Sequence, residues 1–267
     1  MNIKMIALDC DGTLLNSNKK ITDKTKNAIA KAISCGIKVM LASARPFYRL
    51  KPILTTLGSN VADQYTIAFN GGLIMNNNET EVVLSQSFTA EQMQRIIEVG
   101  DQVETMMFLY TQNSILANMD DPKYRKKNPD VAFLVRDLHK EDYKQTKIFK
   151  VAYVNKPEVT TQLKANLPVD MYDSFEVSSS VPQFVEFTQK GVTKAHALDL
   201  ICEKMGISSM DIIAFGDEDN DLPMLAYAGF GVAMGNASQM VKAAADYVTA
   251  TNDEDGVAVA LTNLGVI

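Results

Sequence analysis

Near its start the chain alternates short apolar runs with segments whose apolar residues recur every three or four positions. The short runs are typical of buried strands, and the longer spacing is typical of helices with one buried face. Gly36 and Gly58 mark the ends of two helices, and Pro46 is well placed to begin the second. Strands that alternate with helices indicate right-handed βαβ units and a parallel sheet. The predicted strands are 3–8, 37–42 and 66–69, and the helices are 22–36 and 46–58.

The pattern changes near residue 85. Thr89 and Gln92 have the spacing of a helix capping pair, and the helix that they begin runs through Ile97. Beyond it, alternating apolar runs are joined by short turns. More strands than helices in this stretch indicate an α+β module inserted into the first domain. The runs are 105–110, 114–119, 131–135, 148–154, 171–177 and 183–187, and one further helix is predicted at 156–166.

From Gly191 onward the alternation of helices and strands returns. We therefore predict an α/β fold in which one domain is built from both ends of the chain. Its predicted ranges are 1–83 and 188–267, and the inserted domain is 84–187. In its second half we expect helices at 192–205, from near Asn220, at 237–245 and at 255–264, with strands at 211–215, 230–234 and 247–250.

Asp9 and Asp11 stand one residue apart at the end of the first predicted strand. If the strand continued, both side chains would point the same way, at the sheet edge where open α/β sheets bind ligands. Two carboxylates this close disfavour joint ionisation unless a cation or strong donors lie between them. The pair therefore indicates a metal site with a nucleophile beside a proton carrier. The alternative is an acidic turn at Asp11 and Gly12, which leaves a carboxylate at the end of a buried run unexplained.

Polar residues also follow three other predicted strands. Ser43, Asn70 and Asp217 each stand where a strand ends, so a parallel sheet would gather them in the same crevice. Asp217 is placed to share a cation with the first carboxylate pair, whereas the neighbouring Glu218 and Asp219 suit helix caps. An all-oxygen site with few protein ligands suits Mg²⁺.

Several of these polar residues allow two interpretations. Lys194 falls in the first turn of a predicted helix, where the helix dipole disfavours a cation, so a counter-charge to bound phosphate explains it better than an exposed lysine. Ser43 either caps the helix that begins at Pro46 or donates to a phosphoryl oxygen. Arg45 is either a solvated residue or one whose guanidinium binds phosphate through two hydrogen bonds, and both interpretations remain open. The run 70–72 is either a plain turn or a place where backbone N–H groups approach a ligand.

The composition narrows the possible partners. Lys and Arg number 26 against 32 Asp and Glu, a net charge of −6, which argues against a nucleic-acid or anionic-membrane partner. The basic cluster at 123–127 is interpreted as a solvated loop, with a phosphate-binding patch as the alternative. Two histidines argue against an ordinary zinc site. Three scattered cysteines fit a reducing compartment and no stretch is long enough to span a bilayer, so we expect a cytoplasmic protein.

Together these residues resemble the four motifs of the haloacid dehalogenase-like (HAD) superfamily of hydrolases, in the same order. The run from Asp9 to Leu15 looks like the first motif and Ser43 like the second. Lys194 looks like the third, and the acidic run from Gly216 looks like the fourth. Small departures occur at Ala44, Ala195 and Gly72, and none of them removes a required functional group. The motif residues are Asp9, Asp11, Ser43, Lys194, Asp217, Asn220 and Asp221.

The large insertion before Lys194 resembles the type-2 (C2B-like) cap of the Cof-like branch of this superfamily. The run 214–225 also resembles the corresponding sequence of this branch. The resemblance implies a doubly wound parallel sheet, which is a Rossmann-like core, with an inserted α+β cap domain. It also implies a phosphatase whose cap closes over the substrate and chooses the leaving group.

The resemblance assigns a role to each motif residue. Asp9 would attack phosphorus and form an aspartyl-phosphate, while Asp11 would protonate the leaving group and then activate water. Ser43 and Lys194 would bind the phosphoryl oxygens. The residues expected to line the substrate or phosphate side are Arg45, Asn70, Gly71 and Asn220.

Mg²⁺ is the cofactor that the resemblance implies. The carboxylates of Asp9 and Asp217 and the backbone carbonyl of Asp11 would hold it. Asp221 would bind it directly or through water. These assignments describe the hydrolysis of a small phosphorylated metabolite, such as a sugar phosphate or a phosphorylated cofactor. A phosphosugar mutase on the same scaffold and a non-enzymatic phosphate- or metal-sensing module are the alternatives. The sequence identifies neither the substrate nor the oligomeric state.

Overall fold

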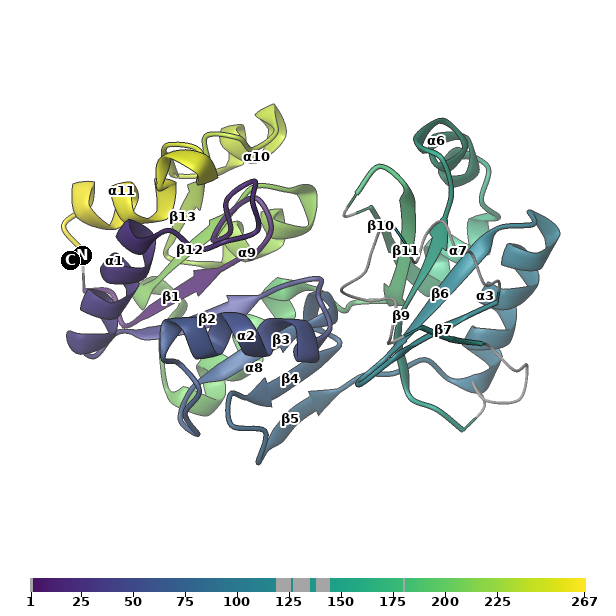
Figure 1. Ribbon diagram of the computed structural model, residues 1–267, viewed down its shortest axis with the longest axis horizontal. Coiled ribbons are helices and arrows are strands. Elements are labelled where there is room, and N and C mark those ends of the chain that lie inside the picture. Colours follow the sequence, from purple (N-terminus) through teal and green to yellow (C-terminus); the bar gives the residue numbers. More distant parts are fainter. Residues whose placement is uncertain (1, 119–125, 127–134, 138–144, 180) are drawn as a thin grey trace. The chain divides into compact units, whose positions relative to one another are not determined.

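The computed structural model describes residues 2–118, 126, 135–137, 145–179 and 181–267. The described chain forms two compact units (Figure 1). The core unit joins the chain up to Ser85 with Thr193–Ile267, and the inserted unit is Gln86–Val192. The basic cluster at 123–127 lies, apart from Lys126, outside the described residues. Among the described residues, no helix has both the length and the apolar character that a bilayer crossing needs.

A sheet of eight strands forms the centre of the core unit. The strands are β1 (Met5–Leu8), β2 (Lys38–Ala42), β3 (Tyr65–Ala68), β4 (Leu73–Asn76), β5 (Val82–Ser85), β12 (Ile212–Gly216), β13 (Phe230–Ala233) and β14 (Tyr247–Val248). Their order across the sheet is β14-β13-β12-β1-β2-β3-β4-β5, and the six strands from β14 to β3 are parallel. The carboxyl ends of these six strands therefore share an edge, as the sequence predicted.

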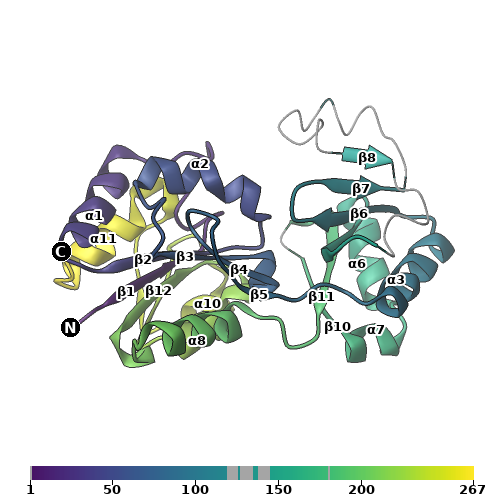
Figure 2. The same ribbon diagram turned by 90° about the horizontal axis from the view of Figure 1, so that it is seen from below.

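Helices cover both faces of this sheet, which confirms the predicted α/β fold. Side chains alternate along β1, so Met5 and Ala7 face one way while Ile6 and Leu8 face the other, and all four are buried. Leu198 packs in the same apolar cluster as Met5 and Ala7. Figure 2 shows α8 on one face and α1, α2 and α11 on the other. The helices are α1 (Asp23–Ser34), α2 (Phe47–Leu57), α8 (Lys194–Met205), α9 (Leu222–Tyr227), α10 (Gln239–Ala244) and α11 (Gly256–Asn263).

Two strands of the core sheet, β4 and β5, were not predicted from the sequence. Both pair antiparallel and extend the sheet beyond β3. Each has four residues, as β1 and β3 have, but no α-helix among the described residues separates β3, β4 and β5, so they lack the alternation with helices that marked the other core strands. The run 77–81 between them is polar and contains Glu79 in a left-handed conformation with φ 63°, which is typical of a tight turn.

The inserted unit has a six-stranded sheet with helices on one face, which agrees with the predicted α+β pattern. Thr89 and Gln92 form the predicted capping box before its first helix. A cluster that includes Met107, Tyr153 and Phe187 packs between this sheet and the helices. The elements are α3 (Ala90–Gln102), β6 (Met106–Thr111), β7 (Ile115–Ala117), β8 (Val135–Asp137), β9 (Ile148–Val154), α6 (Pro157–Ala165), α7 (Val169–Ser174), β10 (Phe175–Ser178) and β11 (Phe184–Gln189).

The strand predicted at 171–177 is wrong over its first half, because α7 occupies residues up to Ser174. Met171 and Phe175, both buried, are four positions apart, a spacing that suits a helix as well as a strand. Pro168 stands just before α7, where its fixed backbone favours a helix start. Of the strand predicted at 131–135, residues 131–134 lie outside the described residues.

Gly71 lies in a tightly packed part of the core unit. Its φ is +117°, and an added Cβ would lie 2.5 Å from the carbonyl oxygen of Thr193, the residue before α8. Gly36 has a positive φ of +82° with nothing within 4 Å of such a Cβ.

We therefore expect Gly71→Ala to lower the free energy of unfolding more than Gly36→Ala does. Gly36→Ala should cost about 1–2 kcal/mol, because it introduces backbone strain alone. Urea unfolding measures both, and equal losses would contradict the crowding argument.

Candidate active site

Asp9 directly follows β1, and its backbone N–H still donates to the carbonyl of Phe215 at 3.1 Å. The side chain is buried, with the residue 7% exposed. Asp9 Oδ1 accepts a hydrogen bond from Lys194 Nζ at 2.5 Å. The sheet thus fixes the backbone of Asp9 at the carboxyl edge, and a cation from a distant helix faces its carboxylate.

Lys194 is the first residue of α8 and one of the largest fully buried side chains. Its Nζ lies 2.5 Å from Asp9 Oδ1 and 2.6 Å from Asp221 Oδ1. Burial alone lowers the pKa of Lys194, but the charges of Asp221 and Asp9 outweigh burial and raise that pKa above its ordinary value. Lys194 is therefore a fixed cation. The interpretation of this residue as an exposed helix lysine is wrong.

Asp9, Asp217 and Asp221 form a buried group in which one oxygen of each lies within 4.8 Å of the others. Burial raises the pKa of Asp9 to about 8, although Lys194 opposes that rise. Burial also raises the pKa of Asp217 to about 7. Three carboxyl groups face a single ammonium here, and the raised pKa values of Asp9 and Asp217 show that ionising them together is costly unless a divalent cation balances the charge. Carboxylate oxygens are the ligands that Mg²⁺ and similar hard cations take, so this group can hold a metal.

Asp221 uses both of its carboxylate oxygens within the protein. Oδ1 accepts from Lys194, and Oδ2 accepts from the backbone N–H groups of Asp217 (2.9 Å) and Glu218 (3.1 Å). An added Cβ on Gly216 would lie 2.4 Å from Asp221 Cβ, so only glycine fits the end of β12. Asp221 therefore fixes the backbone that carries Asp217.

Thr13 and Asn236 hold Asp217 from the other side, and neither was a predicted site residue. Thr13 Oγ1 donates to Asp217 Oδ1 at 2.6 Å, and Asn236 Nδ2 lies 3.5 Å from Asp217 Oδ2. Gly12 packs so closely that an added Cβ would lie 2.1 Å from Asp217 Oδ2. Thr13 stands two residues after Asp11, and that proximity was the available signal. No sequence pattern pointed to Asn236, which reaches the site from the loop after β13.

The carboxylate of Asp11 makes different contacts from those expected. Asp11 Oδ2 accepts from Arg45 Nε (2.6 Å), while Oδ1 accepts from Arg45 Nη2 (2.7 Å) and Lys19 Nζ (2.8 Å). Burial raises its pKa, but the hydrogen bonds and charge of Arg45 prevail and lower the pKa of Asp11 to about 2. The two carboxylates therefore make separate contacts, Asp9 with Lys194 and Asp11 with Arg45 and Lys19. The strand ends at Leu8, and the chain turns at Gly12 with φ +82°, so strand alternation does not reach Asp11.

Ser43 and Arg45 follow β2, and their contacts exclude one alternative for each. Ser43 is buried, and its Oγ accepts from Arg45 N at 3.2 Å. The N-cap of α2 is Pro46, with no side-chain cap bond, so the interpretation of Ser43 as the cap of this helix is wrong. Arg45 is not a freely solvated residue, because its guanidinium pairs with Asp11, and its phosphate-binding alternative stays a prediction.

Asn70 connects the loop after β2 with the loop after β12 through hydrogen bonds. Phe69 and Asn70 have φ values of 52° and 57°, a conformation that costs energy for residues other than glycine. Asn70 N donates to Ser43 O at 3.0 Å, and Asn70 Oδ1 accepts from Asn220 Nδ2 at 2.9 Å. Asn70 is therefore part of a strained turn and not of a plain one.

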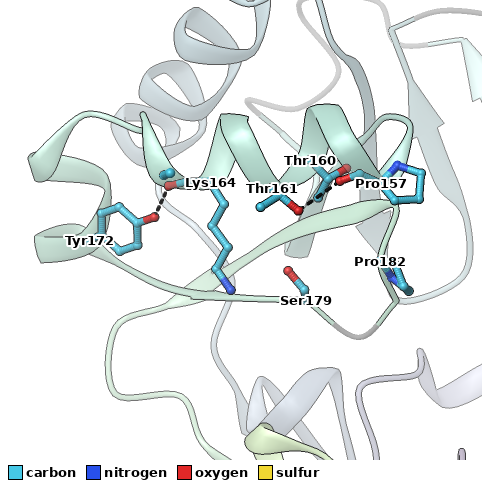
Figure 3. A pocket seen from close by; sticks show the side chains of 8 residues that line it. Pro157, Thr160, Thr161, Lys164, Tyr172, Ser179 and Pro182 are labelled. Carbon is cyan, nitrogen blue, oxygen red and sulfur yellow. Dashed lines mark hydrogen bonds between the residues drawn. The ribbon is translucent and has the colours of Figure 1, made fainter.

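A separate pocket of about 440 Å³ lies in the inserted unit, between α6 and the chain on either side of residue 180 (Figure 3). Thr161 Oγ1 donates to Pro157 O at 3.1 Å, and Tyr172 OH donates to the carbonyl of Lys164. The lining residues that the structure describes include no carboxylate and none of the predicted site residues. This pocket thus lacks the groups that the carboxylate site brings together.

Comparisons with known proteins identify the family of this chain. A sequence model of the haloacid dehalogenase-like hydrolase family matches residues 6–261. The chain is 30% identical over 266 residues to the 5-amino-6-(5-phospho-D-ribitylamino)uracil phosphatase YcsE of Bacillus subtilis, covering 98% of this chain and 95% of that protein.

Solved structures give the same result. A haloacid dehalogenase-like hydrolase from Bacteroides thetaiotaomicron superposes with a TM-score of 0.86 and 32% identity, covering 98% of this chain and 99% of that one. The HAD subclass IIB sugar phosphatase BT4131 gives a TM-score of 0.82 with 26% identity, covering 99% and 100%. The chain is a phosphatase and belongs to the haloacid dehalogenase-like hydrolases.

Proposed function

We propose that this phosphatase hydrolyses small phosphorylated metabolites, sugar phosphates or phosphorylated cofactors, through an aspartyl-phosphate on Asp9 and with Mg²⁺. The observation that carries the proposal is the buried carboxylate of Asp9, which faces the fixed cation of Lys194 and lies within cation-sharing distance of Asp217. A carboxylate nucleophile beside a fixed cation is what attack on an anionic phosphoryl group requires.

In the first step, Asp9 attacks phosphorus in line with the leaving oxygen. The bond between the Asp9 oxygen and phosphorus forms while the bond to the leaving oxygen breaks, and Asp11 gives that oxygen a proton. Ser43 and Lys194 bind the phosphoryl oxygens and so supply the positioning on which phosphoryl transfer depends. Gly71, Asn70 and Asn220 line the phosphate side of the site.

In the second step, water attacks the phosphorus of the aspartyl-phosphate. Asp11 takes a proton from that water, the bond between Asp9 and phosphorus breaks, and inorganic phosphate leaves. Because Arg45 holds Asp11 ionised, Asp11 can carry a proton only when Arg45 turns from it toward the phosphoryl charge. The guanidinium of Arg45 is a suitable fork for that charge.

Asp9, Asp217 and the backbone carbonyl of Asp11 would hold Mg²⁺, with Asp221 anchoring the set. When bound, Mg²⁺ offsets the negative charge between the Asp9 carboxylate and the phosphate. Thr13 orients Asp217 for this purpose through its 2.6 Å hydrogen bond. The all-oxygen donor set supports Mg²⁺ over softer metals.

The substrate class and the location rest on different observations. The names of YcsE and BT4131 refer to a phosphorylated ribityl compound and to sugar phosphates, which supports a small phosphorylated metabolite for this chain. We assign the choice of leaving group to the cap domain, residues 84–187. The net charge of −6 argues against nucleic acid as substrate, and the three free cysteines support the cytoplasm.

Asp9→Asn should abolish Mg²⁺-dependent phosphate release, because an amide is no nucleophile toward phosphorus. Circular dichroism should show an unchanged fold. The matched control is Asp219→Asn, which removes an exposed carboxylate from the acidic turn and should keep full activity. Turnover by Asp9→Asn near that of the unmodified protein would refute the nucleophile assignment.

Stability should depend on pH and Mg²⁺ in a linked way. The pKa of Asp9 rises from 3.8 to about 8 on folding, so the folded metal-free protein keeps a proton that the unfolded chain loses. Its stability should therefore fall as pH rises through that interval. Mg²⁺ replaces the proton, so it should raise the Tm more at about pH 8 than at about pH 6. Asp217→Asn should weaken the effect of Mg²⁺, and an equal Tm rise at both pH values would contradict the linkage.

A panel of phosphorylated metabolites, assayed for phosphate release with and without Mg²⁺, tests the substrate class. Release from sugar phosphates without any bisphosphate activator is expected. A mutase must return the phosphoryl group before water takes it, so isomerised sugar phosphate without phosphate release would favour the mutase alternative.

A further inference from the structure

The loop that carries Asp11 turns back on itself after β1. We call residues 11–20 the Asp11 loop. Asn16 N donates to Lys20 O at 3.0 Å, and Lys19 Nζ donates to Asp11 Oδ1 at 2.8 Å. The far end of the loop thus contacts the carboxylate at its start.

Side chains from the C-terminal part of the chain hold the backbone of this loop. Asn236 Nδ2 donates to Gly12 O at 2.8 Å, and Asn252 Nδ2 donates to Leu15 O at 2.9 Å. Asn252 N in turn donates to Asn236 Oδ1 at 3.0 Å, so the two asparagines support each other. More than 200 positions separate each asparagine from its partner in the loop.

A third anchor is a carboxylate. Asp253 Oδ1 accepts from Ser17 N at 2.8 Å, and Asp253 Oδ2 accepts from Ser17 Oγ at 2.6 Å. Asn252 and Asp253 belong to a short helical turn directly before α11, and α11 packs against α1 in the core unit (Figure 1). The anchors therefore stand on a packed part of the core unit.

The contact between Lys19 and Asp11 is a weak restraint by comparison. The two side chains are 64% and 40% exposed, and exposed ion pairs contribute little because water screens them. Hydrogen bonds restrain the loop backbone at three points instead. Asn236 and Asn252 donate to its carbonyl groups, and Asp253 accepts from one of its N–H groups. The loop also packs on Asp217 through Gly12, but Gly12 has its own anchor in Asn236.

We propose that Asn252 and Asp253 are positioning residues that set the place of Asp11 through the Asp11 loop. The inference rests on the proposed function, in which Asp11 gives its proton to the leaving oxygen as the bond from phosphorus to that oxygen breaks. Neither residue touches the carboxylate of Asp11. Their loss displaces the acid and leaves the nucleophile and its cation in place.

The test compares Asp253→Ala with Glu254→Ala, which removes the same charge one residue on. Glu254 accepts from Thr251 N and Oγ1 and caps its own turn, so it is a matched control. The substrates are an alkyl phosphate, whose alkoxide needs a proton to leave, and p-nitrophenyl phosphate, whose phenolate does not. Asp253→Ala should lower kcat/KM for the alkyl phosphate about tenfold or more and for p-nitrophenyl phosphate less than about threefold, since general acids contribute 10²–10⁴-fold.

Asn252→Ala should show the same split between substrates, and Ser17→Ala, which removes only one hydroxyl, should show a smaller one. Glu254→Ala should lower both values equally or not at all. Equal losses for both substrates in Asp253→Ala, or no loss, would overturn the positioning role. If the unmodified protein releases phosphate from neither substrate, the proposed function itself is wrong.

Discussion

The buried ammonium of Lys194 between Asp9 and Asp221 is the interaction on which the rest of the site depends. A buried charge is stable only when its partners are close, and here the partners come from the end of β1 and from the turn after β12. The contact therefore joins α8 to two neighbouring strands. It also leaves three carboxyl groups around one ammonium, a group that can hold a metal ion.

The central strands and the main site residues could be predicted because both follow from simple geometry. Parallel strands end at a common edge, so Asp9, Ser43 and Asp217 had to be near one another once their strands were recognised. The contacts of Asp11 could not be predicted in this way. They depend on the turn at Gly12 and on where Arg45 reaches, and strand alternation carries no information beyond the last residue of a strand.

The missed elements have a similar explanation. Strands β4 and β5 follow β3 with no described α-helix between them, so they lack the alternation with helices that marked the other strands, and α7 has six residues, too few for helical periodicity to show. Thr13 and Asn236 were missed because each contacts Asp217 by a hydrogen bond from a position some 20 to 200 residues away. Such contacts are products of the folded loops and leave no pattern in the sequence.

The reacting groups and the residues that position them therefore differ in how far a sequence reveals them. The groups for phosphoryl transfer are few, and the sheet itself places Asp9, Ser43 and Asp217 at its edge. In the proposed mechanism the proton carrier is Asp11, which stands on a loop, and a loop needs anchors from elsewhere in the chain to hold a carboxylate at one place. Asn252 and Asp253 provide such anchors after the last strand. On this proposal the final turn before α11 is a functional part of the site, although it contributes no reacting group.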